Sequence, residues 1–333
     1  MTLLDVRDLR LDFPVPGGVM HPVDGVSFSI AKGEVLALVG ESGCGKSLTS
    51  LALLRLVPPP GRIADGSGIS LDGVDLLGLD PGAMRQVRGG RIGMVFQDPM
   101  TSLNPVLTAG DQVVETVRAH LPVTRAEAKQ RAIRLLTEVG IPDPADRFNA
   151  YPHQLSGGLR QRVMIAIALA AEPALLIADE PTTALDVTVQ AQILELLDGL
   201  RRTHGMAVLL ITHDLGVVAG RADRVAVMYA GQIVETADTG ALFQRPSHPY
   251  TQALFASIPR LEGPVGRLKS IPGSVPQPSD WPTGCRFHPR CPFAFEPCAS
   301  AVPPMFQPGP GHDAKCWLLD PARLAAGPRI FSS

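Results

Sequence analysis

The sequence lacks a strong excess of charge of either sign. Its 333 residues carry 30 Lys and Arg against 32 Asp and Glu, which gives a formal net charge of −2. This balance argues against a protein that holds nucleic acid through bulk positive charge, and against a basic membrane-surface protein. Hydrophobic residues make up 45% of the chain. That content is ample for a packed core and excludes a wholly disordered protein.

Long apolar runs are also missing. A transmembrane helix needs about 20 predominantly apolar residues, and the most apolar stretch, 163–178, is interrupted by Glu172 and Pro173. The first residues lack the basic start and the apolar run of a signal peptide. We therefore expect a protein that stays inside the cell, where its five cysteines are poor candidates for structural disulfides.

Short apolar runs are present, and they alternate with helical patterns. The first 40 residues predict short strands, and further strands are predicted at 35–39, 68–71, 92–96, 174–178, 207–211 and 225–229. Helical spacing of apolar residues predicts helices at 47–57, 113–121, 125–140 with Gly140 as the C-cap, 163–171 and 188–200. Strands that alternate with helices indicate an α/β fold with a mainly parallel, doubly wound sheet.

Proline divides the chain near residue 245. Fifteen of the 32 prolines lie in 246–310. This composition predicts a separate C-terminal extension that is too proline-rich for long helices. Such an extension needs another source of order.

A phosphate-binding loop is predicted directly after the strand 35–39. Gly40-Glu-Ser-Gly-Cys-Gly-Lys46-Ser47 fits the pattern G-x-x-x-x-G-K-[ST], with a strand before it and a helix after it. The glycines let the backbone turn its N–H groups toward phosphate, and the helix N-terminus adds a favourable dipole. Lys46 is expected to reach the β- and γ-phosphates, and Ser47 to bind Mg²⁺. Cys44 is interpreted as a loop residue rather than a redox group.

Two carboxylates follow the apolar strand 175–178. In a parallel sheet, the carboxyl end of such a strand opens onto the ligand crevice. Asp179 is expected to hold Mg²⁺, directly or through water, and Glu180 to orient and polarise the attacking water. Alone, such a pair is weak evidence of a site. Its combination with a phosphate loop makes the evidence strong.

The segment Leu155-Ser-Gly-Gly-Leu-Arg-Gln-Arg162 opens a helix. Ser156 suits the N-cap of that helix, but Ser-Gly-Gly at a helix start also makes an anion site. Here the sequence resembles the ATP-binding-cassette (ABC) ATPases, because LSGGLRQR looks like their signature motif. Its position after the phosphate loop and before the acidic strand matches the order of motifs in that family.

The resemblance spans about residues 3–245 and includes the other motifs of the family. Phe96-Gln97-Asp98-Pro99 resembles the Q-loop, which implies that Gln97 senses the γ-phosphate and Mg²⁺ and touches the membrane partner. Ala184-Leu185-Asp186 resembles the D-loop, which crosses the dimer interface. His213 in Ile211-Thr-His-Asp214 resembles the switch histidine, which contacts the γ-phosphate. For the aromatic residue that stacks on adenine, Phe13 and the hairpin near His21 are both candidates.

The resemblance implies an ABC-type P-loop NTPase core in residues 1–245. This core has an N-terminal antiparallel β subdomain and an inserted helical subdomain at about 100–171, and the extension 246–333 follows it. Two cassettes dimerise head to tail, with each ATP between one phosphate loop and the other subunit's Ser-Gly-Gly. The implied catalytic residues are Glu180, His213, Lys46 and Gln97, and the implied Mg²⁺ ligands are Ser47, Gln97 and Asp179. The implied ATP contacts are Gly40, Glu41, Ser42, Gly43, Cys44, Gly45, Lys46, Ser47, Leu48, Gln97, Ser156, Gly157, Gly158, Asp179 and Asp186.

The segment Arg245-Pro-Ser-His-Pro-Tyr-Thr-Gln-Ala-Leu254, followed by Ile258-Pro259, resembles the C-terminal region of the oligopeptide/dipeptide importer subfamily, which includes nickel importers. The alternative is a Pro-rich turn with a docked Tyr250. The resemblance implies the ATPase subunit of a peptide importer, peripheral at the cytoplasmic face of the inner membrane. Its implied partners are a homologous ATPase, two membrane permeases and an extracytoplasmic substrate-binding protein, with no nucleic acid.

Four of the five cysteines, Cys285, Cys291, Cys298 and Cys316, gather in the extension. Four thiolates can hold an iron–sulfur cluster or a tetrahedral zinc ion, and the absence of C-x₂-C pairs counts against a zinc ribbon. The family resemblance favours a [4Fe-4S] cluster, while zinc and unmetallated thiols stay open. His288 and His312 are nearby substitute ligands.

Three other functions are compatible with parts of the sequence. The same machine can carry nickel or another small solute. A soluble cassette ATPase that acts on DNA or ribosomes is disfavoured by the single cassette, the lack of a heptad arm and the net charge of −2. A non-hydrolysing regulatory module is disfavoured by Glu180 and His213.

Overall fold

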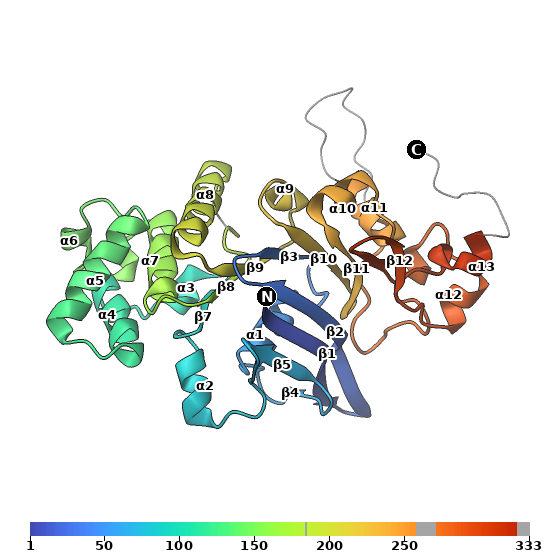
Figure 1. Cartoon of the computed structure of the whole chain (residues 1–333), viewed down its shortest axis with the longest axis horizontal. Coiled ribbons are helices and arrows are strands. Elements are labelled where there is room, and N and C mark those ends of the chain that lie inside the picture. Colours follow the sequence, from blue (N-terminus) through green and yellow to red (C-terminus); the bar gives the residue numbers. More distant parts are fainter. Residues whose placement is uncertain (184, 258–270, 325–333) are drawn as a thin grey trace.

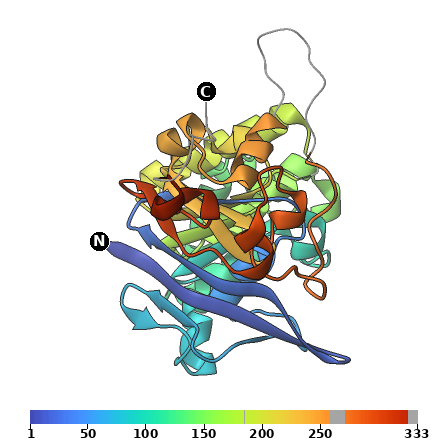
Figure 2. The same cartoon turned by 90° about the vertical axis from the view of Figure 1, so that its right-hand side faces the viewer.

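Two β-sheets packed face to face organise the fold (Figures 1 and 2). The structure is a computed structural model that describes residues 1–183, 185–257 and 271–324. An eight-stranded main sheet runs through the centre, and a five-stranded antiparallel sheet lies beneath it in Figure 1. Above the main sheet in the same view lie α8 (Val187–His204), α9 (Leu215–Val218), α10 (Thr239–Gln244) and α11 (Pro249–Ala256).

The main sheet is mostly parallel, as predicted. Its strand order is β12 (Phe306–Gly309), β13 (His312–Ala314), β11 (Gln232–Asp238), β10 (Arg224–Tyr229), β3 (Val35–Val39), β9 (Ala207–Thr212), β8 (Leu175–Asp179) and β7 (Ile92–Val95). The run from β10 to β7 is parallel throughout, whereas β11, β13 and β12 add antiparallel pairs at one edge. The predicted strands at 92–96, 174–178, 207–211 and 225–229 match their observed bounds to within one residue.

The central strands are buried on both faces, which explains their unbroken apolar runs. In β3, Val35, Ala37 and Val39 belong to a core shared with the helices. The alternate residues Leu36 and Leu38 belong to a second core, shared with the antiparallel sheet and with α1 (Lys46–Leu53). The main sheet is therefore packed on both faces between two hydrophobic cores. This packing fixes the positions of its strand ends, from which the loops start.

Two predictions for the N-terminal half are wrong. Short strands were expected, but β1 (Thr2–Val15) and β2 (Gly18–Ala31) are each 14 residues long and pair over their whole length through several register shifts. The sheet is completed by β4 (Arg62–Ile63), β5 (Gly68–Leu71) and β6 (Val74–Asp75). The helix expected at 47–57 ends at Leu53, because Arg55 has a left-handed backbone (φ 52) and the Leu56 N–H closes onto the Leu51 carbonyl.

Most of the helices between β6 and β8 gather at one end of the molecule, at the left of Figure 1. They are α3 (Pro99–Ser102), α4 (Ala109–His120), α5 (Arg125–Glu138), α6 (Pro144–Arg147), the 3₁₀ turn Pro152–Gln154 and α7 (Gly157–Leu169), while α2 (Pro81–Val87) lies apart from them. A capping box of Thr124 and Glu127 starts α5, and Gly140 just past its end is left-handed (φ 73). Ser156 is the N-cap of α7, as predicted. No helix in the described ranges is long and apolar enough to cross a membrane.

The described residues after 245, namely 246–257 and 271–324, form only short elements, as their proline content predicts. Besides α11, these are the 3₁₀ turns His288–Arg290 and Trp317–Leu319, α12 (Glu296–Ser300), α13 (Pro321–Leu324) and the strands β12 and β13. The main sheet orders this segment, because β13 pairs with β11 and so adds to the edge of the sheet. The boundary at 245/246 remains a prediction, and Ile258 and Pro259 lie outside the described residues.

A buried polar network around β11 holds the C-terminal extension against the edge of the main sheet. Glu235 on β11 is fully buried, and one of its carboxylate oxygens lies 2.7 Å from His312 Nε2 and accepts from the Ser247 N–H at 2.6 Å. The other oxygen accepts from the His248 N–H at 3.0 Å. The His248 ring in turn accepts from the Tyr250 N–H, so His248 acts as the N-cap of α11. Burial lowers the pKa of His248 to about 4, and the nearby Glu235 carboxylate only partly offsets that effect.

The depressed pKa of His248 predicts that the folded protein becomes less stable as the pH is lowered. Between its ordinary value of 6.5 and about 4, the unfolded chain binds a proton on this ring and the folded chain does not. The free energy of unfolding should therefore fall by about 2 kcal/mol between pH 7.5 and pH 5 from this group alone. In His248→Asn, the amide keeps the N-cap acceptor but cannot titrate, so urea unfolding should show a smaller pH dependence. An identical dependence in both proteins would contradict the assignment.

Candidate phosphate-binding site

Four neighbouring strands of the main sheet bring the predicted site residues together. The strands β3, β9, β8 and β7 are adjacent and parallel, so their carboxyl ends lie at one edge. The phosphate loop follows β3, His213 follows β9, Asp179 ends β8 with Glu180 directly after it, and Gln97 follows β7. Residues far apart in sequence thus meet because of the strand order.

Close packing fixes the phosphate loop between β3 and α1. A Cβ atom at Gly40 would lie 2.2 Å from the Met228 carbonyl oxygen, and one at Gly45 would lie 2.6 Å from the Pro22 carbonyl oxygen. Gly45 is also left-handed (φ 108) at the N-cap of α1, so neither position accepts a side chain. Ser42 and Gly43 are exposed at the tip of the loop, whereas Cys44 is buried.

Lys46 lies beneath this loop, with only 4% of its side chain exposed. Its Nζ donates to the carbonyls of Gly40 at 2.8 Å and Glu41 at 3.1 Å, and lies 4.0 Å from Glu180 Oε1. A buried ammonium group held at the mouth of a glycine-rich loop is placed to attract phosphate. The next residues on α1, Ser47 and Leu48, are half-buried.

Asp179 faces the start of α1. Its carboxylate accepts from the Ser47 hydroxyl at 3.1 Å and from the Ser50 hydroxyl at 3.2 Å. Burial raises the pKa of Asp179, and the two hydroxyls and the charge of Lys46 act in the opposite direction. A hydroxyl and a carboxylate in contact are oxygen ligands of the kind that Mg²⁺ takes. Gln97 is not hydrogen-bonded to either Ser47 or Asp179 in the described structure, so the expected set of three is only partly assembled.

Glu180 is the meeting point of the other predicted residues. Its Oε2 accepts from the Gln97 amide at 3.0 Å, and its Oε1 lies 3.4 Å from His213 Nδ1. The backbone of Glu180 is left-handed (φ 46), which is unusual for this residue type. Its N–H is tied to the Ile211 carbonyl at 2.9 Å, so β9 helps to hold that conformation. His213 itself is 59% exposed and thus free to meet a ligand.

The signature segment stands apart from this cluster. Ser156 and Gly157 are exposed, and the Ser156 hydroxyl accepts a long 3.4 Å hydrogen bond from the Leu159 N–H. In the residues that the structure describes, no hydrogen bond joins Ser156 to the phosphate loop. Its neighbour is instead the D-loop region, since a Cβ at Gly158 would lie 3.0 Å from Val189 and Asp186 caps α8. Ala184 of the predicted D-loop lies outside the described residues.

The two candidates for adenine stacking are both in the antiparallel sheet. The half-buried Phe13 ring packs on Gly61, where a Cβ would lie 2.3 Å from the ring. His21 Nδ1 lies 3.0 Å from the Asp12 carboxylate. Neither contact involves the phosphate loop, so the choice stays open.

The arrangement of the four cysteines does not support the predicted metal site. Burial first, and the charges of neighbouring thiols after it, raise the pKa of Cys291 to about 11 and that of Cys316 to about 12. No group of three or more His, Cys, Asp or Glu in the described ranges is placed to hold a metal ion. The histidines are engaged elsewhere, since His288 Nδ1 lies 2.9 Å from the Cys285 carbonyl oxygen and His312 faces Glu235.

Sequence reasoning missed four residues at the site. Ser50 and Thr183 contact Asp179 and Glu180 through their hydroxyls. Ser50 lies one helical turn after Ser47, so helical spacing was an available signal. Tyr250 and Arg290 contact Glu41 from the C-terminal extension. Tyr250 lies in the segment 245–254 that the sequence marks, but no local pattern predicts its contact with the loop. Arg290 is not marked at all, because only the folded sheet brings it to the loop.

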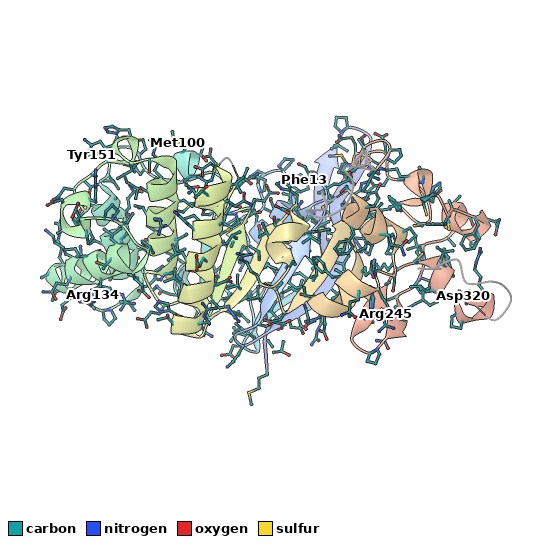
Figure 3. The ribbon with its side chains drawn as sticks, turned by 90° about the horizontal axis from the view of Figure 1, so that it is seen from above. Phe13, Met100, Arg134, Tyr151, Arg245 and Asp320 are labelled. Atoms are coloured by element: carbon teal, nitrogen blue, oxygen red, sulfur yellow. The ribbon has the colours of Figure 1, made fainter. Side chains whose placement is uncertain are left out.

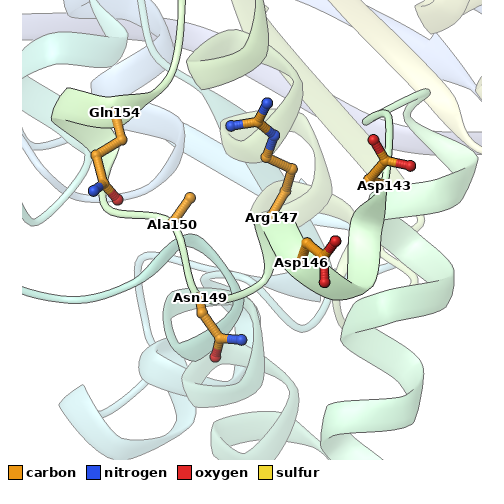
Figure 4. Close-up of a pocket in the computed structure, with 6 residues that line it drawn as sticks. All are labelled: Asp143, Asp146, Arg147, Asn149, Ala150 and Gln154. Atoms are coloured by element: carbon orange, nitrogen blue, oxygen red, sulfur yellow. The ribbon is translucent and has the colours of Figure 1, made fainter.

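A separate polar pocket of about 360 Å³ lies in the helical part. It is lined by Asp143, Asp146, Arg147, Asn149, Ala150 and Gln154 (Figure 4). None of these residues belongs to the phosphate loop or to the strand ends described above. The pocket is therefore distinct from the phosphate-binding site.

Comparison with known proteins gives a consistent result. Residues 23–183 match the family described as ABC transporter, and residues 234–298 match the oligopeptide/dipeptide transporter C-terminal region. The probable peptide ABC transporter ATP-binding protein y4tR of Sinorhizobium fredii is 54% identical over 95% of this chain and 94% of its own. The oligopeptide transport ATP-binding protein OppD of Bacillus subtilis is 52% identical over 96% and 89%. The solved dimer of the ATP-binding cassette MJ0796, bound to ADP and Pi, is 28% identical, with a TM-score of 0.63, over 71% of this chain and 99% of its own.

Proposed function

Because this chain belongs to the ABC transporter family, as an ATP-hydrolysing protein of its oligopeptide/dipeptide group, we propose that it drives the import of peptides. The observation that carries this proposal is the match of residues 234–298, since the ATPase core alone does not distinguish one cargo from another. The names of the relatives also favour peptides over nickel, the alternative cargo.

The proposed mechanism is the attack of water on the γ-phosphorus of ATP, which forms a new P–O bond, breaks the bond to the β-phosphate oxygen, and releases ADP and phosphate. Lys46 and the N–H groups of the phosphate loop would hold the phosphates, and Ser47 and Asp179 would bind Mg²⁺, which supplies charge neutralisation when bound. Glu180 would orient the water and accept its proton. Gln97 and His213 each approach one oxygen of Glu180, so both are placed to align this carboxylate with the γ-phosphate.

We further propose that the chain acts in a head-to-tail dimer with a homologous ATPase. The exposure of Ser156 and the absence, among the described residues, of a hydrogen bond from it to this chain's own phosphate loop support this arrangement. The dimer would sit at the cytoplasmic face of the membrane and work with two permeases and an extracytoplasmic substrate-binding protein. Within the chain, residues 1–245 would form the ATPase and residues 246–333 the extension.

An exposed apolar surface beside the Q-loop supports contact with a permease. Met100 on α3 is 63% exposed and Tyr151 is 39% exposed, and Figure 3 labels both on the same margin of the helical part. Arg160 of α7 contacts the Met100 sulfur and donates to the Pro152 carbonyl, so it links the two segments. A permease loop that binds here would touch both the Q-loop and the signature helix.

The finer prediction of a [4Fe-4S] cluster at Cys285, Cys291, Cys298 and Cys316 stays a proposal. The clustering of the four cysteines in the extension supports it, and their arrangement in this structure does not. Iron and sulfide analysis of protein purified without oxygen is the test. Zinc at one ion per chain without iron would overturn the cluster.

Peptide uptake tests the proposed function directly. Cells that express the complete importer should accumulate labelled di-, tri- or longer peptides, and the Glu180→Gln variant should reduce this uptake to the background of cells without the importer. Radioactive nickel serves as the parallel substrate. Uptake of nickel but not of peptides would overturn the peptide assignment and retain the ATPase mechanism.

A further inference from the structure

Glu41, the second residue of the phosphate loop, is bound by Arg290 of the C-terminal extension. The Arg290 guanidinium meets the Glu41 carboxylate with two parallel contacts, Nη1 to Oε2 at 2.8 Å and Nη2 to Oε1 at 3.0 Å. The two residues are 249 positions apart in sequence. Only 7% of the Arg290 side chain is exposed. A bidentate, mostly buried pair of this kind fixes geometry more tightly than a surface ion pair.

A second contact from the extension holds the backbone of the same residue. The Glu41 N–H donates to the Tyr250 hydroxyl at 2.9 Å. Tyr250 is fully buried, and its ring lies 4.6 Å from that of Tyr229 and 5.3 Å from that of Phe287, measured between ring centroids. Rings packed in this way cannot shift independently. Glu41 is thus fixed through both its side chain and its main chain.

Arg290 is itself anchored at several other points. Its Nε donates to the Pro272 carbonyl at 2.8 Å, and its Nη2 donates to the Gly273 carbonyl at 3.3 Å. Burial acts against its charge, but the hydrogen bonds to Glu41 and Tyr229 hold the pKa of Arg290 above its ordinary value. The guanidinium therefore stays charged and cannot swing away without losing several partners.

A neighbouring arginine fastens the extension without touching the loop. Arg286 donates to Asp24 on β2 and to the Ala230 carbonyl, and its guanidinium lies 3.4 Å from the centroid of the Trp281 ring. Its side chain is 13% exposed, close to the value for Arg290. The two arginines are thus alike in burial and in the segment that carries them, and they differ in whether they contact the phosphate loop.

We propose that Arg290 is a positioning residue for ATP, through which the C-terminal extension sets the conformation of the phosphate loop. The loop binds phosphate through N–H groups that must point inward together. When Glu41 is fixed, this arrangement exists before ATP arrives, and ATP binding does not have to order the loop. The inference rests on nucleotide binding at this loop and is independent of the cargo.

The test compares Arg290→Gln with Arg286→Gln in the full chain, assembled in the importer, with MgATP as the substrate. Arg290→Gln should raise the KM for MgATP about tenfold and change kcat less, because the loop is disordered before binding while the hydrolytic residues stay in place. Arg286→Gln should lower the melting temperature and leave the KM within twofold. Arg290→Lys keeps the charge but not the fork, so it should recover part of the loss.

A second variant guards against misfolding. Glu41 is partly exposed, so Glu41→Ala removes the same contact from the loop side and leaves every residue of the extension unchanged. It should raise the KM as Arg290→Gln does, and the double variant should add little. An unchanged KM in a folded Arg290→Gln protein, or an equal rise in Arg286→Gln, would overturn the proposal. If Lys46→Ala hydrolyses ATP as fast as wild type, the assignment of the nucleotide site is wrong. That result differs from the two results that would overturn the role of Arg290.

Discussion

Glu180→Gln is expected to lower the kcat for ATP hydrolysis by roughly 10²- to 10⁴-fold, the usual contribution of a general base. The change keeps the size of the side chain and removes its ability to accept a proton. The Gln97 amide and the Thr183 hydroxyl donate to Oε2 of Glu180, and an amide oxygen, with its two lone pairs, can still accept both bonds. Lys46, Ser47 and Asp179 are untouched, so MgATP should bind with nearly its original affinity.

The measurement is the steady-state turnover of the assembled importer, together with MgATP binding. Glu172→Gln is a matched control, because Glu172 is 63% exposed and pairs with Arg131 on the surface. The control should keep wild-type turnover. If Glu180→Gln also turned over normally, Glu180 would lose its proposed role, and the acidic end of β8 would serve only to bind Mg²⁺ through Asp179.

Much of this site could be predicted because its residues are constrained locally. The phosphate loop requires glycine at Gly40 and Gly45 to avoid the carbonyls of Met228 and Pro22, and such requirements leave a readable pattern. The strands β3, β8 and β9 are buried on both faces, so their apolar runs are unmistakable. The carboxyl end of each run then marks where a polar side chain becomes functional.

The remainder depends on contacts that no short pattern encodes. The 14-residue strands β1 and β2 were expected to be shorter, because bulges and polar positions interrupt their alternation and only continuous pairing joins the pieces. Arg290 reads as an ordinary arginine in a proline-rich segment. Its function arises because β13 pairs with β11 and carries the extension to the edge of the sheet near the phosphate loop.

Ser156→Arg is expected to lower the importer's ATP turnover by at least about 10²-fold, because it places a long side chain where a partner's nucleotide must approach. Ser156 is exposed at the start of α7, makes a weak capping contact and has no hydrogen bond to this chain's phosphate loop. The folded chain should therefore tolerate the change, with a stability cost of about 1 kcal/mol from the lost cap. MgATP binding to its own phosphate loop should be unaffected.

Thr124→Arg is the control that separates the two effects of Ser156→Arg, namely the loss of a helix cap and the obstruction of the partner's nucleotide. Thr124 is the exposed N-cap of α5, so this variant also exchanges a capping hydroxyl for arginine, but on a helix that carries no signature motif. It should lose similar stability and keep its turnover. If Ser156→Arg kept wild-type turnover and coupled peptide uptake, the head-to-tail arrangement would be wrong. The loss of turnover in Ser156→Arg alone, with MgATP binding to its own phosphate loop unchanged, would support a place for Ser156 at a nucleotide on the partner subunit.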